Sequence, residues 1–204
     1  MTNKLSRNIL FRAMRKAARL VFDTNSACWF ERDLSDPIPD ALPESAVKLS
    51  YSTEETVSWL QAHGEKWMKN ARELAVARAE GHVYPNLKYR NTIIGYIKSG
   101  TGKVFIDDFK ETMTFPPDCA FFYDIYVSDA FRNKGLAQYL AAQMMRYFKV
   151  RGYARVRLHI PGWNTPSITV ARKLGFKEFA RIRAFTILNC IRFKLHLKNH
   201  EKTF

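Results

Sequence analysis

A short basic turn that contains a glycine lies between a strand-forming run and a helical pattern. The run at residues 123–127 ends in a short polar turn, and residues 132–137 follow with the sequence RNKGLA. The first turn of a helix leaves backbone N–H groups without partners, and the helix dipole makes that end positive. Gly135 removes the Cβ that would keep a ligand away from this backbone, and Arg132 and Lys134 add positive charge. These features are typical of a phosphate or pyrophosphate site.

The spacing of this turn does not match the common phosphate loops. It fits neither GxxxxGK[ST] nor GxGxxG. A glycine that only makes a tight turn between a strand and a helix is the simpler explanation of Gly135. The turn by itself leaves both explanations open.

An alternation of strands and helices is expected to hold this turn in place. The pattern predicts a proline-bearing loop at residues 35–45, helices over 52–80 that are separated at Gly64, and a polar loop at 110–118. Strands are predicted at residues 26–34, twice within 91–109, and at 119–127, 154–160 and 177–197, with further helices at 134–151 and 164–175. Strands among helices in both halves predict a mixed α/β domain.

The composition describes a globular chain with a strong positive charge. At 204 residues it is long enough for one domain with a core and short for two. A net charge of +14 indicates an anionic partner, such as a nucleic acid, an anionic membrane, an acidic protein or a phosphate-rich small molecule. The three cysteines are far apart and form no CxxC or Cys/His cluster, so we expect no metal site and a cytoplasmic location.

Residues 1–22 have the pattern of a basic amphipathic helix. Apolar residues recur at spacings of three and four, and lysines and arginines fill the other positions. Such a helix either lies on an anionic membrane surface, here the inner face of the membrane, or packs on the domain with its charged face in water. No apolar run is long enough to cross a bilayer. We expect a helical segment within residues 1–25 and a single domain over residues 26–204.

Two separate motifs are similar to those of a known family. Arg132, Gly135 and Ala137 satisfy [Q/R]xxGx[G/A], which resembles the acyl-CoA-binding motif of the GNAT N-acetyltransferase superfamily. Residues 164–176, NTPSITVARKLGF, are similar to the helix of the same superfamily that runs from an asparagine to LGF. Both motifs follow predicted strands and occur in the family's order. The resemblance is specific over about residues 120–180 and loose over residues 26–119.

The resemblance implies an α/β fold with a central mixed, mostly antiparallel sheet and flanking helices. The sheet would splay open between the strand that ends at Val127 and the strand that contains Leu158, and acetyl-CoA or another acyl-CoA would enter the split. Backbone amides of residues 132–137 would hold the pyrophosphate, while main-chain groups near residue 126 would pair with the pantetheine arm. The cofactor-binding residues implied are Ile125, Tyr126, Val127, Arg132, Asn133, Lys134, Gly135, Leu136, Ala137, Asn164 and Ser167.

The chemistry of the family is the direct attack of a bound amine on the thioester in a ternary complex. The protein must position the amine, give its proton a route and stabilise the oxyanion, for which a backbone N–H near Val127 is the family's usual donor. Asp124 is the first candidate for general base, although strand alternation places it on the face opposite Ile125 unless a bulge redirects it. His159 is the second candidate, and an ordered water is the third. The family's frequent general acid is a tyrosine at a position where this chain has Ala171.

The sequence therefore predicts an N-acyltransferase that acts on a small primary amine, such as an amino sugar, an amino acid or a polyamine. The alternative is a catalytically silent module of the same fold that binds CoA or a protein or membrane partner. We expect no specific nucleic-acid partner, because no helix-turn-helix, zinc-finger or RNP-like motif is found. A monomer and a homodimer are both compatible with the sequence.

Overall fold

The computed structural model describes residues 22–40, 46–63, 77, 79–106, 109, 111–187 and 191–198, with backbone only at 22–25, 184–187 and 191–198. The predicted N-terminal helix lies outside the described residues, and so does most of the helix predicted after Gly64. Among the helices of the described part, none is long and apolar enough to span a membrane.

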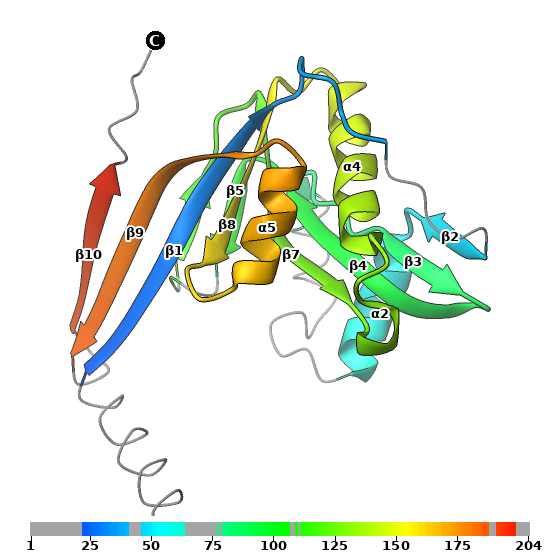
Figure 1. Ribbon diagram of the computed structural model, residues 1–204, viewed down its shortest axis with the longest axis horizontal. Coiled ribbons are helices and arrows are strands. Elements are labelled where there is room, and N and C mark those ends of the chain that lie inside the picture. The colour runs from blue at the N-terminus through cyan, green and yellow to red at the C-terminus, as the bar shows by residue number, and fades with distance from the viewer. Residues whose placement is uncertain are drawn as a thin grey trace, which may run out of the picture.

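Within the described residues, eight strands form one central sheet (Figure 1). Their order across the sheet is β10-β9-β1-β8-β7-β4-β3-β2. Strands β7 and β8 run parallel, and the other neighbouring pairs are antiparallel, which confirms the predicted mixed, mostly antiparallel sheet. The strands are β1 (Phe22–Asp33), β2 (Val47–Ser50), β3 (Asn86–Tyr89), β4 (Thr92–Gly100), β7 (Cys119–Val127), β8 (Arg155–Pro161), β9 (Lys177–Ile187) and β10 (Ile191–Lys198).

The sheet opens in its middle, between β7 and β8. The two strands pair from Cys119 with Arg155 to Phe122 with Leu158. Beyond that point β7 continues to Val127 along β4, and β8 continues to Pro161 along β1. The split lies where the family resemblance implied it, and it divides the sheet into two halves that diverge from a shared base.

Helices cover the two faces of the sheet differently. Helices α4 (Leu136–Lys149) and α5 (Thr165–Lys173) lie on one face, and their apolar sides share a core cluster with Phe122 and Val127. The other face carries helix α2 (Thr53–Ala62) over β4 and a hairpin of β5 (Lys103–Ile106) and β6 (Glu111–Thr114). Side chains of the hairpin bury Trp29 and Phe121 in a second core cluster. The sheet therefore lies between these two core clusters.

Three local expectations differ from the structure. Strand β1 begins at Phe22 rather than at residue 26, because β9 pairs with it over this longer stretch. The predicted loop at 110–118 contains β6, which the hairpin with β5 stabilises. Strands β2 and β3, which have four residues each, are absent from the sequence-based prediction.

Candidate active site

The glycine turn forms the start of α4. Gly135 precedes the helix with φ +73°, and Asn133 also has a positive φ of 63°. The first bond of the helix runs from the N–H of Tyr139 to the carbonyl of Gly135 at 2.9 Å, so the N–H groups of residues 136–138 have no carbonyl partner within the helix. A Cβ at Gly135 would have its nearest neighbour 3.7 Å away, so the positive φ is what requires glycine.

Arg132 ties this turn to the end of β7. Its Nε donates to the carbonyl of Val127 at 3.1 Å, and its terminal nitrogen lies 2.7 Å from the carboxylate of Asp129. Asp129 belongs to a single 3₁₀ turn, Asp129–Phe131, which connects β7 to the glycine turn. The guanidinium is more than half exposed, and its positive charge is paired with the carboxylate of Asp129.

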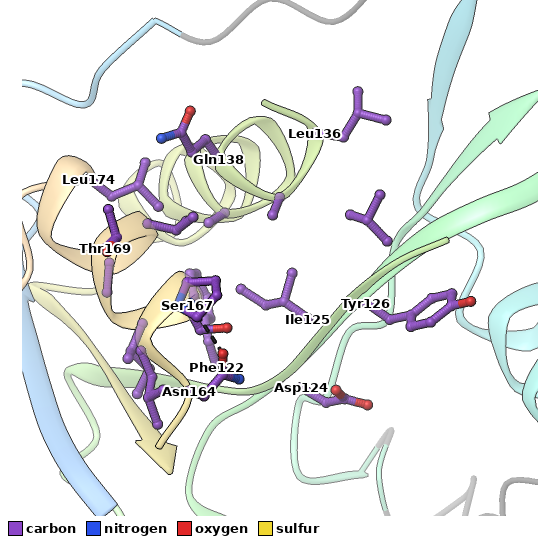
Figure 2. A pocket seen from close by; sticks show the side chains of 18 of the residues that line it. Phe122, Asp124, Ile125, Tyr126, Leu136, Gln138, Asn164, Ser167, Thr169 and Leu174 are labelled. Carbon is purple, nitrogen blue, oxygen red and sulfur yellow. Dashed lines mark hydrogen bonds between the residues drawn. The ribbon is translucent and has the colours of Figure 1, made fainter. Parts of the chain in front are cut away.

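A cavity of about 1100 Å³ lies in the split of the sheet, walled by β7, β8, α4 and α5 (Figure 2). It reaches from the glycine turn to Tyr123, Asp124 and His159. Of the eleven residues that the resemblance implied for cofactor binding, all but Lys134 line this cavity. Lys134 instead places its ammonium 5.7 Å from the ring centre of Phe131.

The start of α5 forms the second wall of the cavity. The Oδ1 atom of Asn164 accepts the backbone N–H of Ser167 at 3.3 Å and so caps the helix (Figure 2). Ala171 is 3% exposed and belongs to the core, so a methyl group occupies the position of the family's tyrosine. Trp163, which precedes α5, lines the cavity and is 78% exposed.

A bulge in β7 decides which residues face the two sides of the sheet. Asp124 pairs with Lys98 and Phe122 pairs with Ser99, so Tyr123 is an additional residue in β7. Phe122 and Ile125 pack toward α4, whereas Asp124 projects from the opposite side (Figure 2). The bulge that the sequence analysis considered is therefore present, but it does not redirect Asp124 to the face of Ile125.

Asp124 is held by two side chains of β4. The hydroxyl of Tyr96 donates to its Oδ2 at 2.9 Å, and the ammonium of Lys98 lies 3.3 Å from the same atom. The Lys98 side chain is fully buried, while that of Asp124 is 38% exposed. Tyr96 stacks on Tyr126 at 5.4 Å between ring centres, and Trp59 of α2 lies 5.8 Å from both rings. Asp124 is thus a fixed carboxylate at the rim of an aromatic cluster.

His159 lies across the split from Asp124. Alternation along β8 puts Leu158 and Ile160 in the core under α4 and α5, and His159 on the other face. Its ring stacks on Phe121 at 5.8 Å, with 2° between the planes, and contacts Trp29 at 5.6 Å. Both candidates for general base therefore line the same cavity, on the face away from α4.

Three residues that the sequence analysis did not select form a cluster beside Asp124. The hydroxyl of Tyr123 donates to the hydroxyl of Tyr84, and Nδ1 of His82 lies 3.3 Å from Tyr84 Oη and 3.4 Å from Tyr123 Oη. Burial raises the pKa of Tyr84 to about 12 and raises that of Tyr123 well above its usual value. Burial also lowers the pKa of His82. No motif marks these residues, because 39 positions separate Tyr84 from Tyr123.

The split sheet and the glycine turn define an acyltransferase-like fold, and comparison with known proteins names the family. Residues 46–176, more than half of the chain, match the family model of the GNAT acetyltransferases. The chain therefore belongs to the GNAT acetyltransferase family. No protein of curated function matches its sequence. Within the described residues, no group of three or more His, Cys, Asp or Glu side chains is placed to hold a metal ion.

Solved structures support the fold. A GCN5-related N-acetyltransferase from Sphaerobacter thermophilus has a TM-score of 0.61 at 12% identity, covering 86% of this chain and 56% of that one. A tandem GNAT protein from the clavulanic acid biosynthesis pathway has a TM-score of 0.60 at 17% identity, covering 87% and 58%. A GCN5-related N-acetyltransferase from Kribbella flavida has a TM-score of 0.54 at 12% identity, covering 84% and 62%. The chain spans about three fifths of the length of these proteins.

Proposed function

We propose that this chain is an N-acyltransferase that transfers an acetyl group from acetyl-CoA to the primary amine of a small molecule. The observation that carries the proposal is one continuous cavity with a helix N-terminus at one end and a fixed carboxylate at the other. The first end suits a pyrophosphate, and the second suits an amine. Family membership supports the same reaction class.

The residues at the glycine turn fit an acyl-CoA. The N–H groups of residues 136–138 point beyond the start of α4 without helical partners, and Arg132, whose charge is paired with Asp129, lines the same end of the cavity. Beyond Phe122, the edge of β7 that faces β8 has no strand neighbour among the described residues, so it offers main-chain groups to an extended pantetheine arm. Acyl-CoA would supply the activated acyl group at the split.

The residues on the other face fit an amine acceptor. Asp124 is proposed to bind the amine and to accept its proton, with His159 as the second candidate. A backbone N–H near Val127 is proposed to stabilise the oxyanion. Because Ala171 offers no acid, the thiolate of CoA would leave and be protonated by solvent.

Two measurements on the full chain test this function. Calorimetry with acetyl-CoA measures binding, and release of the free thiol in the presence of a panel of amino sugars, amino acids and polyamines measures transfer. Binding together with amine-dependent thiol release supports the proposal, and absence of binding contradicts it. Tight binding with no transfer to any amine would favour a silent CoA-binding module, for which the buried Ala171 is the supporting observation.

A further inference from the structure

We propose that Tyr123, Tyr84 and His82 form a directed proton relay that leads from the acceptor side of the cavity to the outside of the protein. The inference rests on the proposed acyl transfer, because the relay would carry the proton that the amine loses. With the relay, the carboxylate of Asp124 would bind the amine, and Tyr123 would accept the proton in its place. The relay would give a function to these three residues, which have no role in the binding of CoA or of the amine proposed above.

The direction of the relay follows from the far side of His82. Its Nε2 lies 3.2 Å from the backbone carbonyl of Lys103, and a carbonyl can only accept, so Nε2 carries the hydrogen. In the neutral ring Nδ1 is then an acceptor, and it receives the hydroxyl hydrogen of Tyr84. The oxygen of Tyr84 in turn accepts from the hydroxyl of Tyr123. All hydrogens therefore point from Tyr123 toward His82.

One end of the relay lies at the cavity, and the other lies outside the cavity lining. Tyr123 is the additional residue of the β7 bulge, and it lines the cavity next to Asp124. The bulge is what allows consecutive residues, Tyr123 and Asp124, to serve the same face of the sheet. His82 lies before β3, outside the cavity lining, and its side chain is partly exposed. A proton that arrives at His82 can pass to water.

Each transfer keeps atoms and electrons balanced. As the amine nitrogen bonds to the acyl carbon, its N–H bond breaks and the proton moves to Oη of Tyr123, while the electron pair of the C–S bond leaves with the sulfur of CoA. The hydrogen of Tyr123 moves to Tyr84 and that of Tyr84 moves to Nδ1 of His82, which becomes an imidazolium. The Nε2–H bond of that ring then breaks, and its proton leaves the Lys103 carbonyl and passes to water. Because each tyrosine gains one proton as it loses another, neither becomes a phenolate.

The electrostatics of the cluster agree with this route. The raised pKa values of Tyr84 and Tyr123 make a phenolate base unfavourable at neutral pH, and concerted transfer does not need one. The lowered pKa of His82 keeps its ring neutral before turnover and lets the imidazolium lose its proton readily. Tyr84 and Tyr123 contact His82 through their hydroxyls, and Glu80 acts on it through its charge. The hydrogen bond to the Lys103 carbonyl and, to a smaller extent, the carboxylate of Glu80 oppose the lowering of the His82 pKa only in part.

The first part of the test needs no substrate. In the full chain with ¹⁵N-labelled histidine, long-range ¹H–¹⁵N spectra report the tautomer of each ring, and His82→Gln assigns the signal. We expect the Nε2–H tautomer for His82. The Nδ1–H tautomer would overturn the relay, whether or not the protein proves to be an acyltransferase.

The second part measures turnover with acetyl-CoA and with spermidine and glucosamine as probe amines. We expect Tyr84→Phe and His82→Gln each to lower kcat by roughly 10- to 100-fold with little change in KM, since they remove proton transfer and not binding. The double variant should be no slower than either single variant, because both break one chain. Loss of the acid limb of the pH profile in His82→Gln would separate proton transfer from a structural role.

Tyr153→Phe is the matched control, because Tyr153 packs against Phe148 at the far end of α4 and lies outside the cavity lining. It should keep the wild-type rate. A wild-type kcat and pH profile in Tyr84→Phe would overturn the relay while leaving the proposed function intact. Absence of turnover in the wild-type chain would contradict the proposed function, and the tautomer of His82 would still decide the direction of the hydrogen bonds.

Discussion

The candidate sites on the two faces of the split sheet differ in whether main-chain groups or side chains form them. On the face of α4 and α5, the candidate cofactor site consists mostly of main chain: the N–H groups at the start of α4 and the open edge of β7. On the opposite face, the candidate acceptor site consists of side chains from α2, β4, β7 and β8 and from the segment before β3. Tyr123 is the extra residue of the β7 bulge, so two consecutive residues, Tyr123 and Asp124, lie on this second face.

Because of this difference, the two faces should respond differently to amino-acid substitutions. A main-chain site depends on backbone dihedrals at a few neighbouring positions, so a single glycine can decide it. A side-chain site depends on the register of strands that are distant in sequence, and each of its members can be replaced without moving the backbone. Substitutions should therefore impair one face and leave the other working.

The largest effect is expected for Gly135→Asp. The variant puts a negative charge against the N–H groups that would hold the pyrophosphate, in addition to the strain of a side chain at φ +73°. We expect the affinity for CoA, measured by calorimetry, to fall by about 100-fold or more.

Gly152→Asp controls for backbone strain in that experiment. Gly152 has φ +84° just after α4, and a Cβ there would meet nothing within 4 Å. Gly152→Asp should lower the free energy of unfolding by about as much as Gly135→Asp does, on the order of 1–2 kcal/mol. It should bind CoA as the wild type does. Equal loss of CoA affinity in both variants would mean that the glycine turn is not the cofactor site.

Asp124→Asn should impair turnover and not the binding of CoA. Removing the carboxylate should lower turnover by about 100-fold or more with CoA affinity unchanged, since Asp124 faces away from α4. His159→Gln is the comparison, because it exchanges the other candidate base on the same face. A larger loss of turnover in His159→Gln than in Asp124→Asn would reverse the order of the two candidates.

A smaller effect concerns stability and pH. The pKa of His82 is lowered in the folded protein, so below the unfolded value of about 6.5 the unfolded chain binds more protons. Stability should therefore fall as the pH drops through this window. Denaturant unfolding of the wild type and of His82→Gln between about pH 5 and 8 checks this, and the difference between the two should shift in favour of the variant at acid pH. A constant difference across the range would exclude a contribution from His82.

The smallest effect is expected at Trp163. Its exposed ring lines the cavity beside α5, so CoA should change its fluorescence. Trp163→Phe should abolish most of this signal and change the affinity for CoA by only about two- to threefold. If CoA still changes the fluorescence of Trp163→Phe as much as that of the wild type, the change comes from another tryptophan, such as Trp59 near Tyr126.

The sequence supports the prediction of the cofactor face better than that of the acceptor face. Long strands, α4 and α5 carry clear periodicity, and the glycine turn lies within six consecutive residues. The partners of Asp124 could not be predicted, because Tyr96 and Lys98 reach it only through the β4–β7 register. The bulge that sets this register leaves no local signal, and the position of His82 depends on contacts 41 residues away. Long-range pairing decides both.

The split also places the edge of a strand inside the molecule. An exposed strand edge is a template on which other chains can add strands and aggregate. Here the edge of β7 beyond Phe122 lies in a cavity that α4 and α5 wall on one side, so an extended small ligand reaches it more easily than another protein's strand does. The same arrangement that would admit an acyl-CoA arm therefore also acts as protection against self-association through β7.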